Sequence, residues 1–192
     1  MDYLEILGTI IGVIYLILEY RANKLLWIAG FIMPAIYVVV YFRAGLYADF
    51  GINVYYLIAS VYGMLVWHHG AKNDAGEQAE LPIVNTPRSN IIPLVAVFAA
   101  TFVVIAFILD RFTDSDVVIA DSFTTALSIV GMWMLARKYL EQWLVWIAVD
   151  VVSSVLYIYK ELYFTSALYA LYTIIAIFGY FKWRNLMKYG NN

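Results

Sequence analysis

Residues 142–159 read QWLVWIAVDVVSSVLYIY, and this run decides the class of fold. It approaches the length of about 20 apolar residues that crosses the hydrocarbon core of a bilayer. Its one charged residue, Asp150, lies near the middle of the run. Because backbone groups in lipid must be satisfied internally, we expect this run to form a transmembrane helix.

Six further runs of the same kind make up most of the chain. Of its 192 residues, 64% are hydrophobic and only 14% are charged, whereas soluble domains average about 25% charged residues. The composition therefore predicts an all-α membrane protein with seven transmembrane helices. The expected helices are residues 4–20, 24–42, 50–67, 91–109, 117–136, 142–159 and 164–181.

The polar stretch 68–90 contains glycines, prolines and charges, so we interpret it as a loop. It is the main linker of a single transmembrane domain covering residues 1–192. The chain has no cysteine, which excludes disulfides and thiolate metal sites, and its two histidines are adjacent in this loop, so we expect no metal and no cofactor. It also lacks a glycine-rich phosphate loop and a paired catalytic group at membrane depth, which argues against an enzyme.

The basic residues are divided unequally between the two sides of the expected membrane. With seven helices, one side receives nine of them and the other three. The first set is Arg21, Lys24, Lys72, Arg88, Arg137, Lys138, Lys182, Arg184 and Lys188, and the second is Arg43, Arg111 and Lys160. Because cytoplasmic loops carry the excess of Lys and Arg, we expect a cytoplasmic C-terminus and an outside N-terminus.

The two halves of the chain resemble each other when one is shifted by 116 residues. The shift aligns identical residue types: Arg21 with Arg137, Trp27 with Trp143, Tyr41 with Tyr157, Tyr56 with Tyr172, Gly63 with Gly179 and Trp67 with Trp183. We expect a parallel 3+1+3 repeat of the SWEET type, with residues 4–67 and 117–183 as repeats and residues 91–109 as the connector helix. The alternative is that aromatic residues simply recur at helix ends.

Polar and aromatic side chains share one face of the run 142–159, because they are spaced three or four residues apart. An aspartate at the centre of a membrane helix costs about 2.5–3.5 kcal/mol, so Asp150 is a candidate binding residue, although a packing role remains open. Aromatic faces beside a buried carboxylate suit an organic cation. The candidate substrate-binding residues are Trp143, Trp146, Asp150, Ser154, Asn53, Tyr56, Tyr169 and Tyr172.

Three residues near helix ends have simpler interpretations. Trp67 and Trp183 lie at the ends of their runs on the basic side, where we expect them to belong to the aromatic belt at the membrane surface. Glu19 is near Arg21 and Lys24, and we expect a surface ion pair there.

The run Trp143-Leu-Val-Trp146-Ile-Ala-Val-Asp150, with Tyr157-Ile-Tyr-Lys160 downstream, resembles the PnuC family of nicotinamide riboside transporters. The resemblance covers nearly the whole chain outside residues 68–90. It implies a homotrimer in the bacterial inner membrane and facilitated diffusion of the solute, which a cytoplasmic kinase then traps by phosphorylation. It also places Trp143, Trp146 and Asp150 in the substrate region.

One departure from the family pattern affects the substrate. Where many riboside transporters have N-x-W-x-W-P, this chain has Asn23-Lys-Leu-Leu-Trp27-Ile-Ala-Gly30-Phe-Ile-Met-Pro34. Nicotinamide riboside and thiamine therefore both stay open, and both are cations. A membrane scaffold that transports nothing is the alternative of another class, and proton coupling through Asp150 is a further possibility.

Overall fold

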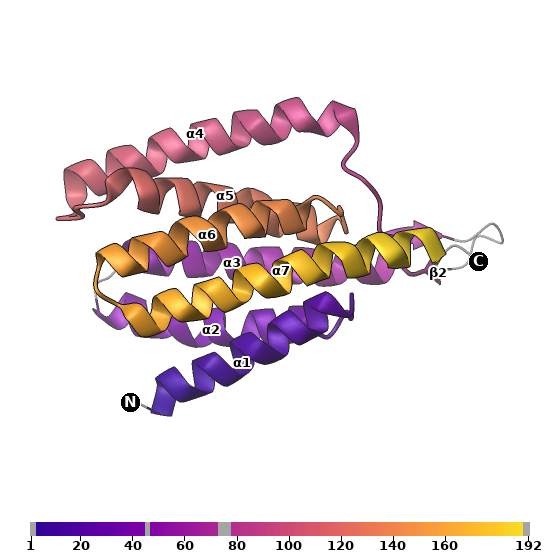
Figure 1. The fold of residues 1–192 in the computed structure, drawn as a ribbon, viewed down its shortest axis with the longest axis horizontal. Coiled ribbons are helices and arrows are strands. Elements are labelled where there is room, and N and C mark those ends of the chain that lie inside the picture. Colours follow the sequence, from indigo (N-terminus) through magenta and orange to yellow (C-terminus); the bar gives the residue numbers. More distant parts are fainter. Residues whose placement is uncertain (1–2, 45–46, 73–77, 190–192) are drawn as a thin grey trace. The chain divides into compact units, whose positions relative to one another are not determined.

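The computed structural model describes residues 3–44, 47–72 and 78–189. Over these residues the chain forms seven helices and one short hairpin, which confirms the predicted all-helical class (Figure 1). The helices are α1 (Tyr3–Tyr20), α2 (Leu26–Ala44), α3 (Tyr47–His69), α4 (Arg88–Phe112), α5 (Val118–Ala136), α6 (Gln142–Tyr159) and α7 (Tyr163–Tyr189). The hairpin consists of β1 (Ala71–Lys72) and β2 (Gln78–Ala79).

Five of the helices are long and apolar enough to cross a membrane, judged by length and composition over the described residues. They are the segments Phe50–His69, Arg88–Phe112, Val118–Ala136, Gln142–Tyr159 and Tyr163–Tyr189. Two shorter apolar stretches, Ile10–Tyr20 and Leu26–Val40, lie within α1 and α2. The helix formed by residues 142–159 has the predicted bounds, whereas α7 continues beyond residue 181 to Tyr189. This extension carries Lys182, Arg184 and Lys188, whose charges suit the C-terminal end of a helix.

Part of the stretch that we predicted to be a loop is ordered against the α5–α6 turn. The Val84 N–H donates to the Lys138 carbonyl at 3.2 Å, and the Leu140 N–H donates to the Val84 carbonyl at 2.9 Å. The Glu141 carboxylate accepts hydrogen bonds from both the N–H and the hydroxyl of Thr86, each at 2.7 Å. Residues 83–87 are therefore anchored, and residues 73–77 of the predicted loop lie outside the described part of the chain.

The chain divides into two compact units, Met1–Pro82 and Ile83–Asn192. In the first unit α2 packs against both α1 and α3. In the second unit α4 packs against α5, and α6 lies between α5 and α7 (Figure 1). The helix that we predicted as a connector, α4, thus belongs to the second unit.

The α1–α2 turn and the α5–α6 turn have the same backbone geometry. Ala22 and Lys138, which the 116-residue shift aligns, both have left-handed φ angles, of 51° and 52°. The N–H of Ala22 donates to Glu19 O, and that of Lys138 donates to Leu135 O, each at 2.9 Å. Two positions 116 residues apart therefore end α1 and α5 with the same hydrogen bond.

A pair of packed tryptophans also recurs in both units. The rings of Trp27 and Trp67 meet edge to face with centroids 5.6 Å apart, at 87°, and those of Trp143 and Trp183 do so at 5.6 Å and 88°. All four side chains are buried. The prediction that Trp67 and Trp183 form an aromatic belt is therefore wrong, because each ring is covered by the tryptophan of a neighbouring helix.

Aligned glycines make room for these tryptophans. A Cβ atom on Gly179 of α7 would lie 2.7 Å from the Trp143 ring, and one on Gly63 of α3 would lie still closer to the Trp27 ring. No side chain larger than hydrogen fits at such a distance, so both glycines allow close helix approach, as their type suggests in membrane helices.

Glu19 is buried, with 2% of its surface exposed, so the predicted surface position is wrong. Tyr15, one helical turn earlier on α1, is close enough to interact electrostatically with this carboxylate. Residues four positions apart share a helix face, and here that face is packed inside the protein.

Candidate solute-binding site

Asp150 lies in the interior of α6 and is buried, with 7% of its surface exposed. The same buried face of the helix carries Gln142, Trp143, Val149, Ser153 and Leu156. Tyr172 of α7 is close enough to interact electrostatically with the Asp150 carboxylate. The structure thus brings together two of the predicted site residues from adjacent helices, at the depth where a charge is costly unless it has a function or a partner.

Tyrosine rings extend from Asp150 along the α6–α7 interface. The Tyr169 ring stacks on Tyr157 with centroids 5.2 Å apart, and it meets Tyr172 edge to face at 5.7 Å. All three rings are partly exposed. This row of aromatic faces ends at the tyrosine beside the carboxylate, so it offers a planar cation a surface on which to stack.

The two tryptophans of α6 differ in their surroundings. Trp143 is buried between Trp183 and Gly179, so its ring is a packing element of the α6–α7 pair. Trp146 is partly exposed, and a Cβ atom on Gly131 of α5 would lie 3.3 Å from its ring. The indole N–H groups of both tryptophans lack a hydrogen-bond partner among the described residues, so the exposure of the ring is what separates them. Trp146 is therefore the better placed of the two to contact a solute.

Ser154 takes part in a reciprocal pair of hydrogen bonds between helices. Its hydroxyl donates to the Ser166 carbonyl at 3.0 Å, and the Ser166 hydroxyl donates to the Ser154 carbonyl at 2.9 Å. These bonds join α6 to α7. The sequence predicts that Ser154 binds the solute, and in the structure its hydroxyl takes part in helix packing.

Asn53 and Tyr56 belong to α3 of the first unit, where both are partly buried. Tyr56 packs beside Tyr55, with ring centroids 5.7 Å apart, and it is also close enough to interact electrostatically with Tyr15. The other six candidate residues lie on α6 and α7 of the second unit. Within each unit, the candidates are therefore neighbours on one helix or on adjacent helices.

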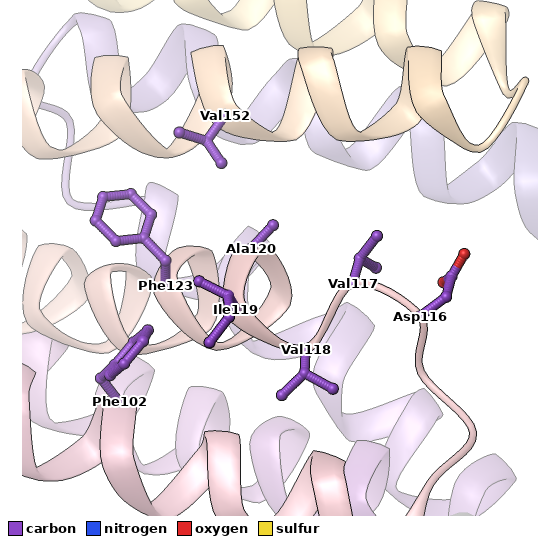
Figure 2. A pocket seen from close by; sticks show the side chains of 8 residues that line it. All are labelled: Phe102, Asp116, Val117, Val118, Ile119, Ala120, Phe123 and Val152. Atoms are coloured by element: carbon purple, nitrogen blue, oxygen red, sulfur yellow. The ribbon is translucent and has the colours of Figure 1, made fainter.

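A pocket of about 670 Å³ lies elsewhere in the second unit (Figure 2). Phe102 of α4, Phe123 of α5 and Val152 of α6 line it, together with residues 116–120. None of the candidate site residues does so. Val152 follows Asp150 by two positions, which turns its side chain to another face of α6. The lining is apolar apart from Asp116, so this pocket is not the aromatic site predicted around Asp150.

Sequence reasoning missed one polar residue of the buried α6 face. Gln142 is 0% exposed, and neither atom of its side-chain amide has a hydrogen-bond partner in the described parts of the chain. Its spacing of four residues from Trp146 could have identified it.

Known proteins similar to this chain are bacterial membrane transporters. The Escherichia coli nicotinamide riboside transporter PnuC is 25% identical over 209 residues, covering 96% of this chain and 86% of the relative. The Haemophilus influenzae protein of the same name is 20% identical and covers 99% and 83%. The Neisseria mucosa protein of that name is 22% identical over 97% of this chain and 74% of its own length.

A solved structure has the same fold. The crystal structure of the vitamin B3 transporter PnuC superposes with a TM-score of 0.70 at 21% identity, covering 97% of this chain and 82% of that one. The family described as nicotinamide mononucleotide transporter matches residues 2–185 of this chain. The chain is therefore a multi-pass membrane protein that belongs to the nicotinamide mononucleotide transporter family.

Proposed function

We propose that this chain carries a cationic vitamin precursor, nicotinamide riboside above others, across a bacterial inner membrane by facilitated diffusion. The observation that carries the proposal is the buried Asp150 carboxylate of α6, with Tyr172 beside it and the aromatic ring of Tyr169 next in the row. Nicotinamide riboside contains a pyridinium, and a desolvated cation gains from both a carboxylate and aromatic faces. The relatives named as nicotinamide riboside transporters support the same substrate.

The charge of the site favours a nucleoside over a nucleotide. The helices Val118–Ala136 and Gln142–Tyr159 and residues 163–181 contain no Lys, Arg or His. A phosphate group adds a charge of about −1.5 to −2 at neutral pH, and it would be repelled by Asp150 with no cation on these segments to compensate. The family's description names the mononucleotide, whereas the chemistry of this site suits the dephosphorylated riboside.

The transport mode follows from the same reasoning. Facilitated diffusion needs a sink, which phosphorylation by a cytoplasmic kinase would supply, because the phosphorylated product no longer fits a site with a buried carboxylate. The recurring turns and tryptophan pairs support the 3+1+3 repeat. A homotrimer, a cytoplasmic C-terminus and a SWEET-like arrangement are parts of this proposal.

Thiamine is the second candidate, because it is also a cation and because the chain does not keep the N-x-W-x-W-P pattern of many riboside transporters. When the pattern starts at Asn23, Leu25 stands where it has its first tryptophan. This difference concerns which solute binds and leaves the fold and transport mode unchanged.

Calorimetry on the detergent-purified protein tests the proposal directly. We expect nicotinamide riboside to bind the wild type, and Asp150→Asn and Trp146→Ala to weaken binding by at least about 10-fold, since hydrogen bonds to charged groups contribute about 1.5–3 kcal/mol. Leu144→Ala is the control, because Leu144 lies on the same turn but is exposed. Binding of thiamine without binding of nicotinamide riboside would make thiamine the substrate. Binding of neither solute would refute the proposal and favour a scaffold.

A further inference from the structure

Gln142 at the start of α6 has an amide that is fully buried yet unpaired. None of its surface is exposed, and both Oε1 and Nε2 lack a hydrogen-bond partner among the residues that the structure describes. Leaving a buried donor and acceptor unsatisfied is costly, and native proteins rarely do so without a reason. The backbone N–H of Gln142 does have a partner, because it donates to the Tyr139 carbonyl at 3.2 Å.

The amide belongs to the same buried face as the site residues. Gln142, Trp146 and Asp150 are successive steps of four along α6, and Gln142 and Asp150 are both buried. The indole N–H of Trp146, one turn away, is also buried without a partner in the described residues. Unpaired polar atoms thus recur over the first two turns of the helix, ahead of Asp150.

A glutamine amide has one donor and one acceptor side by side, so it pairs best with a group that presents the complementary pair. We infer that Gln142 recognises the donor–acceptor edge of the solute, such as the primary carboxamide on a pyridinium ring. This inference rests on the proposed function. An aminopyrimidine, as in thiamine, presents the same kind of edge, in the way that adenine pairs with an amide side chain.

The spacing along the helix fits the order of groups in a pyridinium riboside. With a rise of 1.5 Å per residue, Trp146 is about 6 Å and Asp150 about 12 Å along the axis from Gln142. A carboxamide at Gln142 would place the cationic ring beside Trp146 and the sugar hydroxyls toward Asp150 and Tyr172. Three side chains of one helix would then each contact one of the three parts of the solute.

The test compares two solutes that differ only at this edge. Nicotinic acid riboside has a carboxylate, which accepts hydrogen bonds but cannot donate one to Oε1 of Gln142. We expect the wild type to prefer nicotinamide riboside over it. In Gln142→Met, which nearly conserves volume, we expect nicotinamide riboside affinity to fall about 10- to 100-fold. The preference should shrink but not vanish, because Asp150 still repels the carboxylate of nicotinic acid riboside. Leu144→Ala serves as the control, with unchanged affinity and preference.

If thiamine is the solute, its analogue with an oxo group in place of the ring amino group replaces nicotinic acid riboside in the same comparison. Unchanged affinity and preference in Gln142→Met would overturn the inference while leaving the proposed function intact. Binding of neither solute to the wild type would instead refute the proposed function, and this inference with it. The two failures are therefore distinguishable.

Stability of the ligand-free protein provides a second measurement. Replacing an unpaired buried amide with an apolar side chain should raise the melting temperature without solute, by about 2–8 °C, even as the affinity falls. A glutamine that only holds the fold together would give the opposite result, with a lower melting temperature in Gln142→Met. Gln142→Leu repeats the test with a different shape, and a fall in melting temperature in both variants would contradict the inference.

Discussion

Gly179 of α7 has no room for a methyl group, and this makes Gly179→Ala a sharp test of the packing. The Cβ atom would lie 2.7 Å from three atoms of the Trp143 ring, whereas ordinary contacts begin at 3.4 Å. The ring would have to move by about 0.7 Å, a displacement worked from these two distances. It cannot move freely, because it is buried and its edge packs against Trp183.

The expected loss of stability follows from two opposing effects. Overpacking a filled interior costs about 1–3 kcal/mol. Replacing glycine by alanine within a helix stabilises the folded state by about 0.5–1 kcal/mol. We therefore expect Gly179→Ala to reduce the free energy of unfolding by about 1–2 kcal/mol, which lowers the melting temperature by about 2–8 °C for a chain of this size.

The assay is thermal unfolding of the detergent-purified protein, with Gly51→Ala as the matched control. Gly51 is also a helical glycine, but a Cβ atom there has nothing within 4 Å. We expect Gly51→Ala to melt at or above the wild-type temperature. In the double variant Gly179→Ala with Trp143→Phe, the smaller ring should make the two losses less than additive. A Gly179→Ala protein as stable as the wild type would refute the reasoning.

Three further predictions concern other contacts. Gly63→Ala should lower the melting temperature at least as much as Gly179→Ala, because its Cβ atom would lie even closer to the Trp27 ring. A melting temperature equal to that of the wild type would show that α2 and α3 are not this close. Ser154→Ala and Ser166→Ala should each cost about 0.6–1 kcal/mol in thermal unfolding, and only a Ser154 that also binds solute would lower affinity in calorimetry. Glu141→Ala should speed tryptic cleavage after Arg88, because its two hydrogen bonds to Thr86 are lost. Cleavage should be unchanged in the control Glu80→Ala, since Glu80 is exposed. If Glu141→Ala is cleaved as slowly as the wild type, residues 83–87 are not anchored by these bonds.

Hydrophobic runs were sufficient to predict the helices, because a chain in lipid has few alternatives for its backbone hydrogen bonds. The run 142–159 has the predicted bounds, and Asp150 stands out as the one charge within it. The 116-residue shift aligns Trp27 with Trp143, and each of these rings packs edge to face against a second tryptophan. These are local properties of the chain, and they follow from residue type and spacing.

Burial could not be predicted in the same way. In a membrane helix nearly every face is apolar, so the pattern does not tell which side meets lipid and which meets another helix. Trp67, Trp183 and Glu19 were therefore assigned to the surface, and the structure places all three inside. Ser154 is predicted to bind the solute, whereas its bonds to Ser166 depend on where α7 lies.

The sequence by itself determined the class of protein, the helices and the charged residue around which the candidate site is built, because these depend on residues close together in the chain. Only the tertiary structure decided that Trp143 fills a space left by Gly179 and that the Gln142 amide is buried unpaired. Packing and hydrogen-bond satisfaction depend on neighbours far apart in sequence, and no local pattern encodes which neighbours those are.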